Sequence, residues 1–409
     1  MKPLLLESFT ATSCIGQGAL PTLESLRARR SGLARCGFET VDIDTHIGEV
    51  PGVDAVRLPA ALSRFDCRNN RLAELALRQD GFVEAVGRAA SRCGRRRIGV
   101  FLGTSTAGIL QTELAYRNRD AATGALPASF EYSTTHNSFS VADYLRRRLG
   151  LEGPAMVVSC ACASSAKVFG SARRMIEAGI IDAAVVGGVD SLCLTTLYGF
   201  HSLQLSSALP CRPFDVARDG ISIGEAAAFA LLAPPHERLN GDDVLLLGVG
   251  ESSDAYHMSA PHPEGHGARR AMQAALRAAG LDAEAIDYIN LHGTGTPSND
   301  RSESQAVTSV FGAATPGSST KGATGHTLGA AGALEAVISA ITLRSGFMPG
   351  GVHTTHVDPM LTAHYLKENR ASPASYVLSN SFGFGGTNCS LIFGRAGAGS
   401  REIPRQAPR

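Results

Sequence analysis

The sequence has almost no net charge and rather few charged residues. Its 409 residues carry 38 Lys and Arg against 37 Asp and Glu, which leaves a formal net charge of +1. This balance argues against a nucleic-acid-binding protein held by bulk positive charge, although a local basic patch stays open. Hydrophobic residues make up 44% of the chain and charged residues 18%. The composition therefore favours a globular protein with a buried core.

Long apolar runs are also missing. Three leucines follow Pro3 before Glu7 interrupts them, which is too short for the apolar region of a secretory leader. No run approaches the roughly 18 residues that a membrane-spanning helix needs. The cysteines number nine, an odd count. We therefore expect a cytoplasmic protein without a membrane span, whose thiols are mostly free and buried.

Short apolar runs alternate with longer, Ala-rich amphipathic stretches. This alternation predicts an α/β fold with a mainly parallel sheet covered by helices. The predicted strands are 97–102, 155–159, 183–186, 229–232, 244–249, 288–291 and 390–393. The predicted helices are 70–90, 165–178, 267–279, 302–310 and 329–345.

The length of the chain suggests two packed halves or one large α/β domain. Pro234 and Pro235 precede a polar stretch and mark a candidate seam. Each half contains a strand that runs into a Gly/Thr turn, at 102–106 and at 291–296, which suggests a duplication but is too short to prove one. The predicted units are an N-terminal half 1–236, a C-terminal half 237–395 and a flexible tail 396–409.

Cys162 lies where a β-branched run gives way to small residues and then to a predicted helix. At a helix N-terminus the free backbone N–H groups and the helix dipole favour a thiolate over a thiol. The turn thus resembles a nucleophile elbow. Two other interpretations stay open at this point. Cys160 and Cys162 could form half of a zinc site, although no second pair has the matching spacing, or the turn could be inert and packed.

Two histidines lie in turns rich in Gly and Thr. His292 follows a predicted strand, and His326 lies in a Gly-rich loop before an Ala/Gly helix. A single such histidine is usually a satisfied polar residue, but two at element boundaries favour a site that substrate approaches closely. One Cys with two His suits carbon–carbon bond formation from thioesters, because neutral imidazoles can hydrogen-bond an enolate oxygen. A cysteine protease would need one His and an orienting Asn or Asp instead.

Glu335 lies in an otherwise apolar predicted helix. A carboxylate in such a setting needs a partner, and Lys321 is the candidate, unless Glu335 faces water. Farther along, three glycines surround Phe382 and Phe384. This pattern predicts either a bendable loop with aromatic groups that can block a channel, or a turn with a buried aromatic anchor.

These segments together resemble the β-ketoacyl-acyl-carrier-protein synthases of fatty-acid and polyketide synthesis, in the elongating branch with a Cys-His-His triad. Several signatures occur in the family's order along most of the chain. They are 12–16, the turn at Cys162, 213–220, 320–326 and 380–388. The resemblance implies the thiolase fold, with two similar βαβαβαββ halves in a five-layered α/β/α/β/α arrangement.

The resemblance also implies residue roles, with no metal, nucleotide or flavin cofactor. Cys162 takes the acyl chain, His292 and His326 bind the malonyl thioester during decarboxylation, and Lys321 pairs with Glu335. Backbone N–H groups of Cys162 and Phe384 form the oxyanion hole, and Phe384 acts as the gate. The substrate contacts are assigned to Thr106, Phe200, Thr294, Thr296 and Phe382.

Some positions differ from the family pattern. Lys167 replaces the His of many relatives, and Thr106 stands where relatives often carry the Gly or Ile that sets chain length. The first strand and the region 190–202 are also looser matches. These differences favour a specialised branch, such as aryl-polyene or other polyketide assembly, over primary fatty-acid synthesis.

The resemblance implies an acyl carrier protein as partner, and a homodimer or a heterodimer with a chain-length-factor-like subunit. Because carrier proteins of relatives are acidic, Arg64, Arg68 and Arg71 are candidates for a docking patch, with a solvated helix face as the simpler interpretation. A non-catalytic subunit is disfavoured because Cys162 and both histidines are present. A degradative thiolase would need a second late cysteine, for which Cys389 is a poor candidate.

Overall fold

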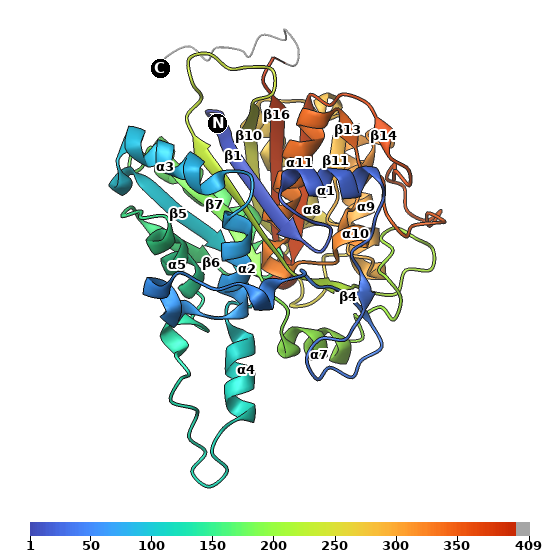
Figure 1. Cartoon of the computed structure of the whole chain (residues 1–409). Coiled ribbons are helices and arrows are strands. Elements are labelled where there is room, and N and C mark those ends of the chain that lie inside the picture. The colour runs from blue at the N-terminus through green and yellow to red at the C-terminus, as the bar shows by residue number, and fades with distance from the viewer. Residues whose placement is uncertain (398–409) are drawn as a thin grey trace.

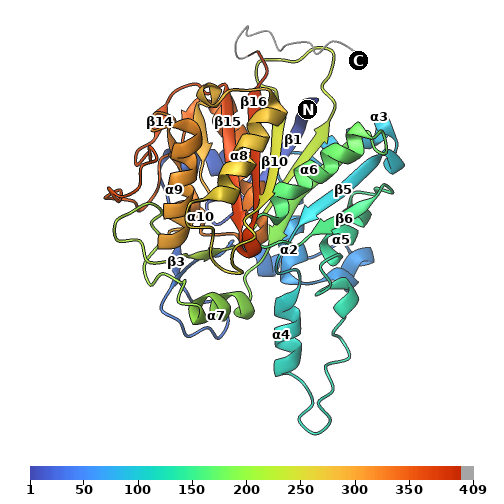
Figure 2. The same ribbon diagram turned by 180° about the vertical axis from the view of Figure 1, so that it is seen from behind.

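The computed structural model describes residues 1–397 of the chain (Figures 1 and 2). Most of the predicted tail 396–409 therefore lies outside the described residues. The helices are α1 Ala19–Arg27, α2 Arg68–Leu77, α3 Phe82–Cys93, α4 Ile109–Arg117, α5 Ser140–Arg148, α6 Ser164–Glu177, α7 Leu194–Ser202, α8 His266–Ala279, α9 Pro297–Phe311, α10 Lys321–Thr324 and α11 Ala331–Ser345.

Ten strands form the core of the molecule and divide equally between the two halves of the chain. In the first half they are β1 Leu4–Ser13, β5 Ile98–Gly103, β6 Ala155–Val158, β7 Ala183–Asp190 and β9 Ala226–Ala233. In the second half they are β10 Val244–Ser253, β11 Tyr288–Asn290, β12 Gly317–Ser318, β15 Tyr376–Gly383 and β16 Thr387–Arg395. The short strands are β2 Gly16–Gln17, β3 Ala34–Arg35, β4 His46–Gly48, β8 Ile223–Gly224, β13 Phe347–Met348 and β14 Arg370–Ala371.

The strand order is the same in the two halves when each is read inward from its outer edge. The first half runs β6-β5-β7-β9-β1 and the second runs β12-β11-β15-β16-β10. The outer three strands of each half are parallel, and the inner two pair antiparallel. The halves join where β1 meets β10, with Leu4 opposite Leu246 and Leu5 opposite Leu245. This repeat is the pseudo-symmetry of the thiolase fold.

Three hydrophobic clusters define five layers. One cluster lies between the two halves of the sheet and contains α6 and α11 with the inner faces of both halves. A second packs α2, α3 and α5 on the outer face of the first sheet, and a third packs α8 and α9 on the outer face of the second. Helix α11 packs on β15 of the second half and on β9 of the first, and α6 packs on β5, β7 and α11. Figure 1 shows α11 beside β16, and Figure 2 shows α6 in front of the strands of the first half. The predicted α/β/α/β/α arrangement is confirmed.

Small residues allow the two central helices to approach each other. A Cβ atom on Gly332 would lie 2.7 Å from the backbone nitrogen of Ala166, so only glycine fits there. The side chain of Ser165 accepts a 2.8 Å hydrogen bond from the backbone N–H of Ala333. By length and composition, Leu328–Ser345 could cross a membrane, contrary to the sequence-based expectation, but 89% of that stretch is buried. Burial between two sheets explains its apolar composition.

The predicted helix 70–90 is wrong in one respect, because the chain breaks it into α2 and α3. Asp80 and Gly81 adopt left-handed conformations, with φ of 55° and 64°. The carboxylate of Asp80 accepts a 2.9 Å hydrogen bond from the backbone N–H of Ala19, at the start of α1. This contact between distant segments favours a turn at a place where the apolar periodicity continues.

Candidate active site

The first half places Cys162 in the connection between its third strand, β6, and the following helix, α6. Ala161 has φ of 54°, a left-handed conformation that is strained for a residue with a Cβ atom. Ser164 holds the turn, because its hydroxyl accepts a 2.9 Å hydrogen bond from the backbone N–H of Cys160. The strained turn and the helix that follows give the elbow geometry expected from the sequence.

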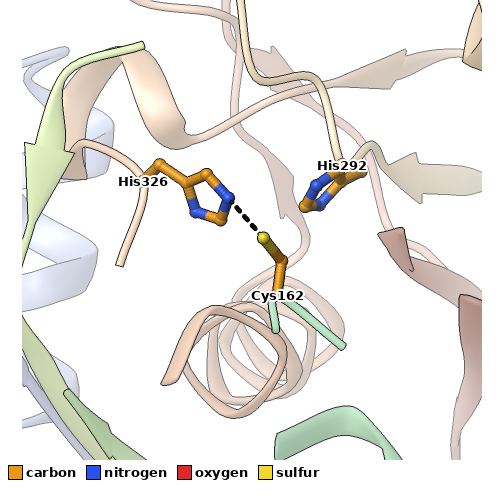
Figure 3. Close-up of side chains that lie close together, drawn as sticks. All are labelled: Cys162, His292 and His326. Carbon is orange, nitrogen blue, oxygen red and sulfur yellow. Dashed lines mark hydrogen bonds between the residues drawn. The ribbon is translucent and has the colours of Figure 1, made fainter. Parts of the chain in front are cut away.

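The second half places His326 in the equivalent connection, between its third strand β12 and α11. Nε2 of His326 lies 3.0 Å from Sγ of Cys162. His292 follows β11 and approaches the sulfur from the other side (Figure 3). The two imidazole rings are 5.3 Å apart between centroids and meet at 85°. The pseudo-symmetry of the fold thus brings the cysteine turn of one half against the histidine turns of the other.

Neighbouring groups fix which ring nitrogen of each histidine carries the proton. Nδ1 of His326 accepts a 3.3 Å hydrogen bond from the backbone N–H of Leu328. Nδ1 of His292 lies 3.4 Å from Nζ of Lys321, which can only donate. In both neutral rings the proton therefore lies on Nε2, which faces the pocket. Burial, with Lys321 adding to it, lowers the pKa of both histidines well below 6.5. Two neutral N–H donors result.

Lys321 lies behind the histidines and is itself almost fully buried, with 1% of its side chain exposed. Its Nζ bonds the carboxylate of Glu335 and donates a 2.6 Å hydrogen bond to the carbonyl oxygen of His292. Glu335 thus has the partner that the sequence suggested, and it does not face water. The cation also disfavours a metal ion at Cys162, His292 and His326, although their ligand atoms lie within 4.8 Å of one another.

The thiol of Cys162 differs from the sequence-based expectation of a stabilised thiolate. Burial raises its pKa to about 11, while Lys321 and the backbone N–H of Phe384 lower it to a smaller extent. Only 7% of Cys162 is exposed. Desolvation disfavours the anion more than these groups favour it. In the free protein Cys162 is therefore a thiol at neutral pH.

This raised pKa predicts how the reactivity of Cys162 depends on pH. Because alkylation consumes the thiolate, the rate with iodoacetamide should rise about tenfold for each pH unit between about pH 7 and about pH 9. The rate at the Cys162 peptide can be followed by mass spectrometry after quenching at several times. A rate that already levels off between about pH 6 and about pH 8 would show instead that the helix dipole and His326 hold a thiolate.

Two buried acids on α9 position the His292 loop, and the sequence reasoning missed both. Glu303 accepts 2.7 Å hydrogen bonds from the backbone N–H groups of His292 and Gly293. Asp300, one helical turn earlier, accepts one from Gly295 at 3.2 Å. Burial raises the pKa of Glu303 to about 7. Asp300 and Glu303 lie three positions apart in a polar helix, so both fall on one helix face. This spacing was the signal that could have identified them, but it is also typical of acids on a solvated face.

A pocket opens onto Cys162, His292 and His326. Five of the sequence-predicted substrate or gate residues line it, namely Phe200, Thr294, Thr296, Phe382 and Phe384. The rings of Phe200 and Phe384 lie 5.7 Å apart at one side of the cavity. A Cβ atom on Gly383 would lie 3.2 Å from the backbone nitrogen of Cys162, so the end of β15 passes close behind the nucleophile.

Thr106 does not belong to this pocket lining. Its hydroxyl donates a 2.8 Å hydrogen bond to the buried carboxylate of Asp190, which also binds the backbone N–H groups of Ser105 and Thr106. Lys167 is likewise turned away, with Nζ 3.7 Å from Glu251. Cys389 is fully buried within β16, where burial raises the pKa of its thiol. These positions give no support to the degradative-thiolase interpretation.

The predicted arginine patch is wrong for Arg68. Its side chain is only 3% exposed and forms ion pairs with Glu225, Glu49 and Asp54. Arg71 is committed to Asp66 at 2.6 Å. Arg64 is exposed and contacts Glu131 at 3.2 Å. The arginine-rich segment is compatible with an exposed helix face in the sequence. In the fold Glu225, which is distant along the chain, pairs with Arg68, and both side chains are buried.

A cysteine nucleophile and two N–H-donating imidazoles, meeting in one pocket between two thiolase-type halves, define a condensing enzyme that acts on thioesters. Sequence profiles agree: the N-terminal domain of β-ketoacyl synthases matches residues 64–237 and the C-terminal domain matches residues 244–355. The chain belongs to the β-ketoacyl synthase family. It is an acyl-transferring enzyme that condenses thioesters in fatty-acid or polyketide elongation.

Individual relatives point the same way. The chain is similar to 3-oxoacyl-[acyl-carrier-protein] synthase 2 of Staphylococcus aureus, with 30% identity over 96% of this chain and 98% of that protein. It is 40% identical to a mitochondrial 3-oxoacyl-[acyl-carrier-protein] synthase of Arabidopsis thaliana over 61% of this chain and 58% of that one. A ketosynthase from Xenorhabdus doucetiae, solved in complex with its chain length factor, has 37% identity and a TM-score of 0.87 and covers 97% of this chain and 98% of its own.

Proposed function

We propose that Cys162 accepts the acyl chain and that His292 and His326 hold the enolate oxygen of the malonyl thioester. The observation that carries this proposal is the meeting of the three side chains in one pocket, with Sγ of Cys162 3.0 Å from Nε2 of His326. Lys321 and Glu335 act as positioning residues for His292. The threonines Thr294 and Thr296 lie along the pocket wall, where a pantetheine arm would pass.

In the first step, Sγ of Cys162 attacks the carbonyl carbon of an acyl thioester. A sulfur–carbon bond forms, the bond to the carrier thiol breaks, and the thiol proton of Cys162 ends on that leaving sulfur. The Nε2–H of His326 stabilises negative charge on Sγ as the proton departs. Backbone N–H groups of Cys162 and Phe384 form the oxyanion hole for the tetrahedral intermediate.

In the second step, a malonyl thioester loses CO2 and the bonding electron pair becomes an enolate. The two Nε2–H groups converge on the position of that oxygen, where neutral donors stabilise charge without a proton transfer. The resulting carbanion attacks the acyl carbon on Cys162, and the cysteine leaves as a thiolate that regains a proton. The product is a 3-oxoacyl thioester. Because both Nδ1 atoms are acceptors, neither histidine serves as a general base.

This proposal predicts the effect of removing each imidazole. Either His292→Ala or His326→Ala should slow decarboxylation of malonyl carrier protein by roughly 10²- to 10³-fold, as expected for loss of one oxyanion donor. Release of labelled CO2 measures the reaction without requiring an acyl acceptor. His236→Ala, an exposed histidine between β9 and β10, is the matched control and should retain the full rate. Full-rate decarboxylation by either pocket variant would exclude the assigned role.

An open strand edge supports a second subunit as partner. Strand β6 is the outermost strand of its sheet; it pairs with β5 on one side, and within residues 1–397 no strand pairs with its other side. Met156 on this strand is 43% exposed. Unpaired apolar edges bind further strands unless they are covered. We infer that β6 lies at a subunit interface, in a homodimer or with a chain-length-factor-like partner, as the Xenorhabdus ketosynthase has.

The interface has a direct test. Light scattering on the purified chain, alone and mixed with a chain-length-factor-like protein, should show a dimer in at least one case. Met156→Arg would place a charge on the edge and should shift that dimer toward monomers, whereas Leu20→Arg, at an exposed leucine in α1, should not. If Met156→Arg leaves the dimer intact, the interface lies elsewhere.

The relatives and the cysteines indicate which thioester donor the protein uses and in which compartment it works. An acyl carrier protein is the inferred donor of both thioesters, since the relatives are named for it. The likeness to a ketosynthase with a chain length factor favours a polyketide-type branch, while an aryl-polyene product stays a prediction. All nine cysteines are free, which supports a reducing, cytoplasmic location.

A further inference from the structure

A second cluster of potential ligands lies outside the catalytic trio, in the connection between β10 and α8. His262, Glu264 and His266 each offer one ligand atom, and these atoms all lie within 4.8 Å of one another. The two imidazole rings are stacked, with centroids 4.1 Å apart and planes at 19°. Oε2 of Glu264 lies 2.8 Å from Nε2 of His266. Imidazole and carboxylate donors in this spacing are typical ligands of zinc and related dications.

The backbone that carries the cluster is held in place before any ligand arrives. The carbonyl oxygen of His262 accepts hydrogen bonds from the N–H of Gly265 at 2.8 Å and from the hydroxyl of Ser302 at 2.9 Å. Gly265 has φ of 63°, and a Cβ atom there would lie 2.5 Å from the carbonyl oxygen of Ser302. Asp254 accepts from the N–H of His262 at 3.2 Å. This turn fixes His262 and His266 on one side of the chain.

We propose that His262, Glu264 and His266 bind a divalent transition-metal ion of the Zn²⁺ class through two imidazole nitrogens and one carboxylate oxygen. Ligands about 2.1 Å from a zinc ion lie about 3.4 Å apart in a tetrahedron, so modest side-chain rotation closes the site. A solvent molecule would occupy the fourth position.

Two local features oppose the ion, and neither is large. The site lies at the positive end of the α8 dipole, which disfavours a cation, and the carboxylate of Glu264 offsets this. Nδ1 of His262 accepts a 3.2 Å hydrogen bond from the N–H of Glu264. Binding through Nε2 would exchange that long hydrogen bond for a metal bond.

The position of the cluster gives the ion a structural consequence. Ser259, Ala260 and Pro261, which directly precede His262, line the pocket that contains Cys162. An ion that ties His262 to α8 would hold this pocket wall in place. The site is therefore a metal site beside the pocket mouth, separate from the catalytic trio.

Equilibrium dialysis of the full chain against Zn²⁺ tests the proposal. Cys162 is first alkylated with iodoacetamide, because Cys162, His292 and His326 form another set of possible ligands. We expect one Zn²⁺ per chain. His266→Ala and His262→Ala should each weaken binding at least about tenfold, since each removes one of three ligands. His257→Ala is the matched control on the same loop; this exposed histidine is outside the cluster, and its removal should leave binding unchanged.

Substitution of Co²⁺ gives an independent readout. Ligation by nitrogen and oxygen alone should produce visible d–d bands without a thiolate charge-transfer band, and the bands should vanish in His266→Ala. Equal Zn²⁺ affinity in the wild-type, His262→Ala and His266→Ala proteins would overturn the proposal. So would binding that disappears on alkylation of Cys162. Because the assay measures metal binding alone, its failure would leave the condensing function untouched.

Discussion

Cys162→Ala is expected to lose condensation by at least about 10⁴-fold while it still decarboxylates malonyl carrier protein. The sulfur is the atom that carries the acyl chain, so its loss removes the covalent intermediate. The two imidazoles are positioned by Leu328 and Lys321 rather than by the sulfur. Their donor geometry therefore survives the substitution. Product formation from acyl and malonyl carrier proteins, measured beside CO2 release, separates the two activities.

The neighbouring thiol provides the matched control. Cys160 is two residues earlier in the same turn and partly exposed, and its backbone N–H donates a hydrogen bond to Ser164 that does not depend on the thiol. Cys160→Ala should therefore condense at a rate within a few-fold of the wild-type rate, since it keeps the nucleophile and the turn. Condensation by Cys162→Ala at the wild-type rate, or its loss in Cys160→Ala alone, would contradict the assignment of the nucleophile.

Lys321→Met is expected to lower the free energy of unfolding by about 3–5 kcal/mol, because it leaves one member of a buried ion pair without its partner. Lys321 and Glu335 are 1% and 3% exposed at their side chains. The carbonyl oxygen and Nδ1 of His292 lose their contact with Nζ as well. Urea unfolding of the wild type and the variant measures the difference, and decarboxylation should slow together with it.

The loss should also depend on pH. Burial raises the pKa of Glu335 to about 7, and Lys321 is what opposes that rise. Without the lysine the folded state retains a proton on Glu335 that the unfolded state releases above about pH 4.5. Between about pH 4.5 and about pH 7 both proteins should lose stability as pH rises, because Glu335 is protonated in both folded states. Above about pH 7 the wild type levels off, whereas Lys321→Met should keep falling, by up to about 1.4 kcal/mol per unit relative to the wild type.

The double variant Lys321→Met/Glu335→Leu is the control for this interpretation. With both charges gone it should recover much of the lost stability, because apolar groups of similar size can replace a buried ion pair. It should not recover decarboxylation, since His292 still lacks its partner. A Lys321→Met protein as stable as the wild type at every pH would show that the pair does not contribute to folding.

The sequence predicted most of the sheet because buried strands have distinctive apolar runs. The two Gly/Thr turns directly follow β5 and β11, which are the second strands of the two halves and occupy equivalent places in them. It did not identify β15, whose Tyr376–Gly383 run mixes serine, asparagine and glycine with apolar residues. Those polar side chains are buried by the surrounding layers. The break between α2 and α3 falls at Asp80-Gly81, a dipeptide typical of turns, but the apolar periodicity that continues through it predicted one helix.

The candidate site was predictable to the extent that its chemistry lies in short turns. Cys162 lies in a turn of small residues between a strand and a helix, and His292 and His326 lie in Gly-rich turns, so their element boundaries could be read locally. The pKa of Cys162 could not, because it depends on burial of the thiol in the folded protein, which outweighs Lys321 and the nearby backbone N–H groups. The roles of Glu303 under His292 and of Asp190 under Thr106 also depend on contacts across the fold.

The most direct test of the proposed function is the mass of the Cys162 peptide after incubation with acyl carrier protein. We expect that this peptide gains the acyl mass, that Cys162→Ala gains none, and that the mass disappears when malonyl carrier protein is added and a 3-oxoacyl product forms. The size of the acyl group would also identify the substrate class. Acylation at another of the nine cysteines, or an acyl mass that malonyl carrier protein does not remove, would contradict it.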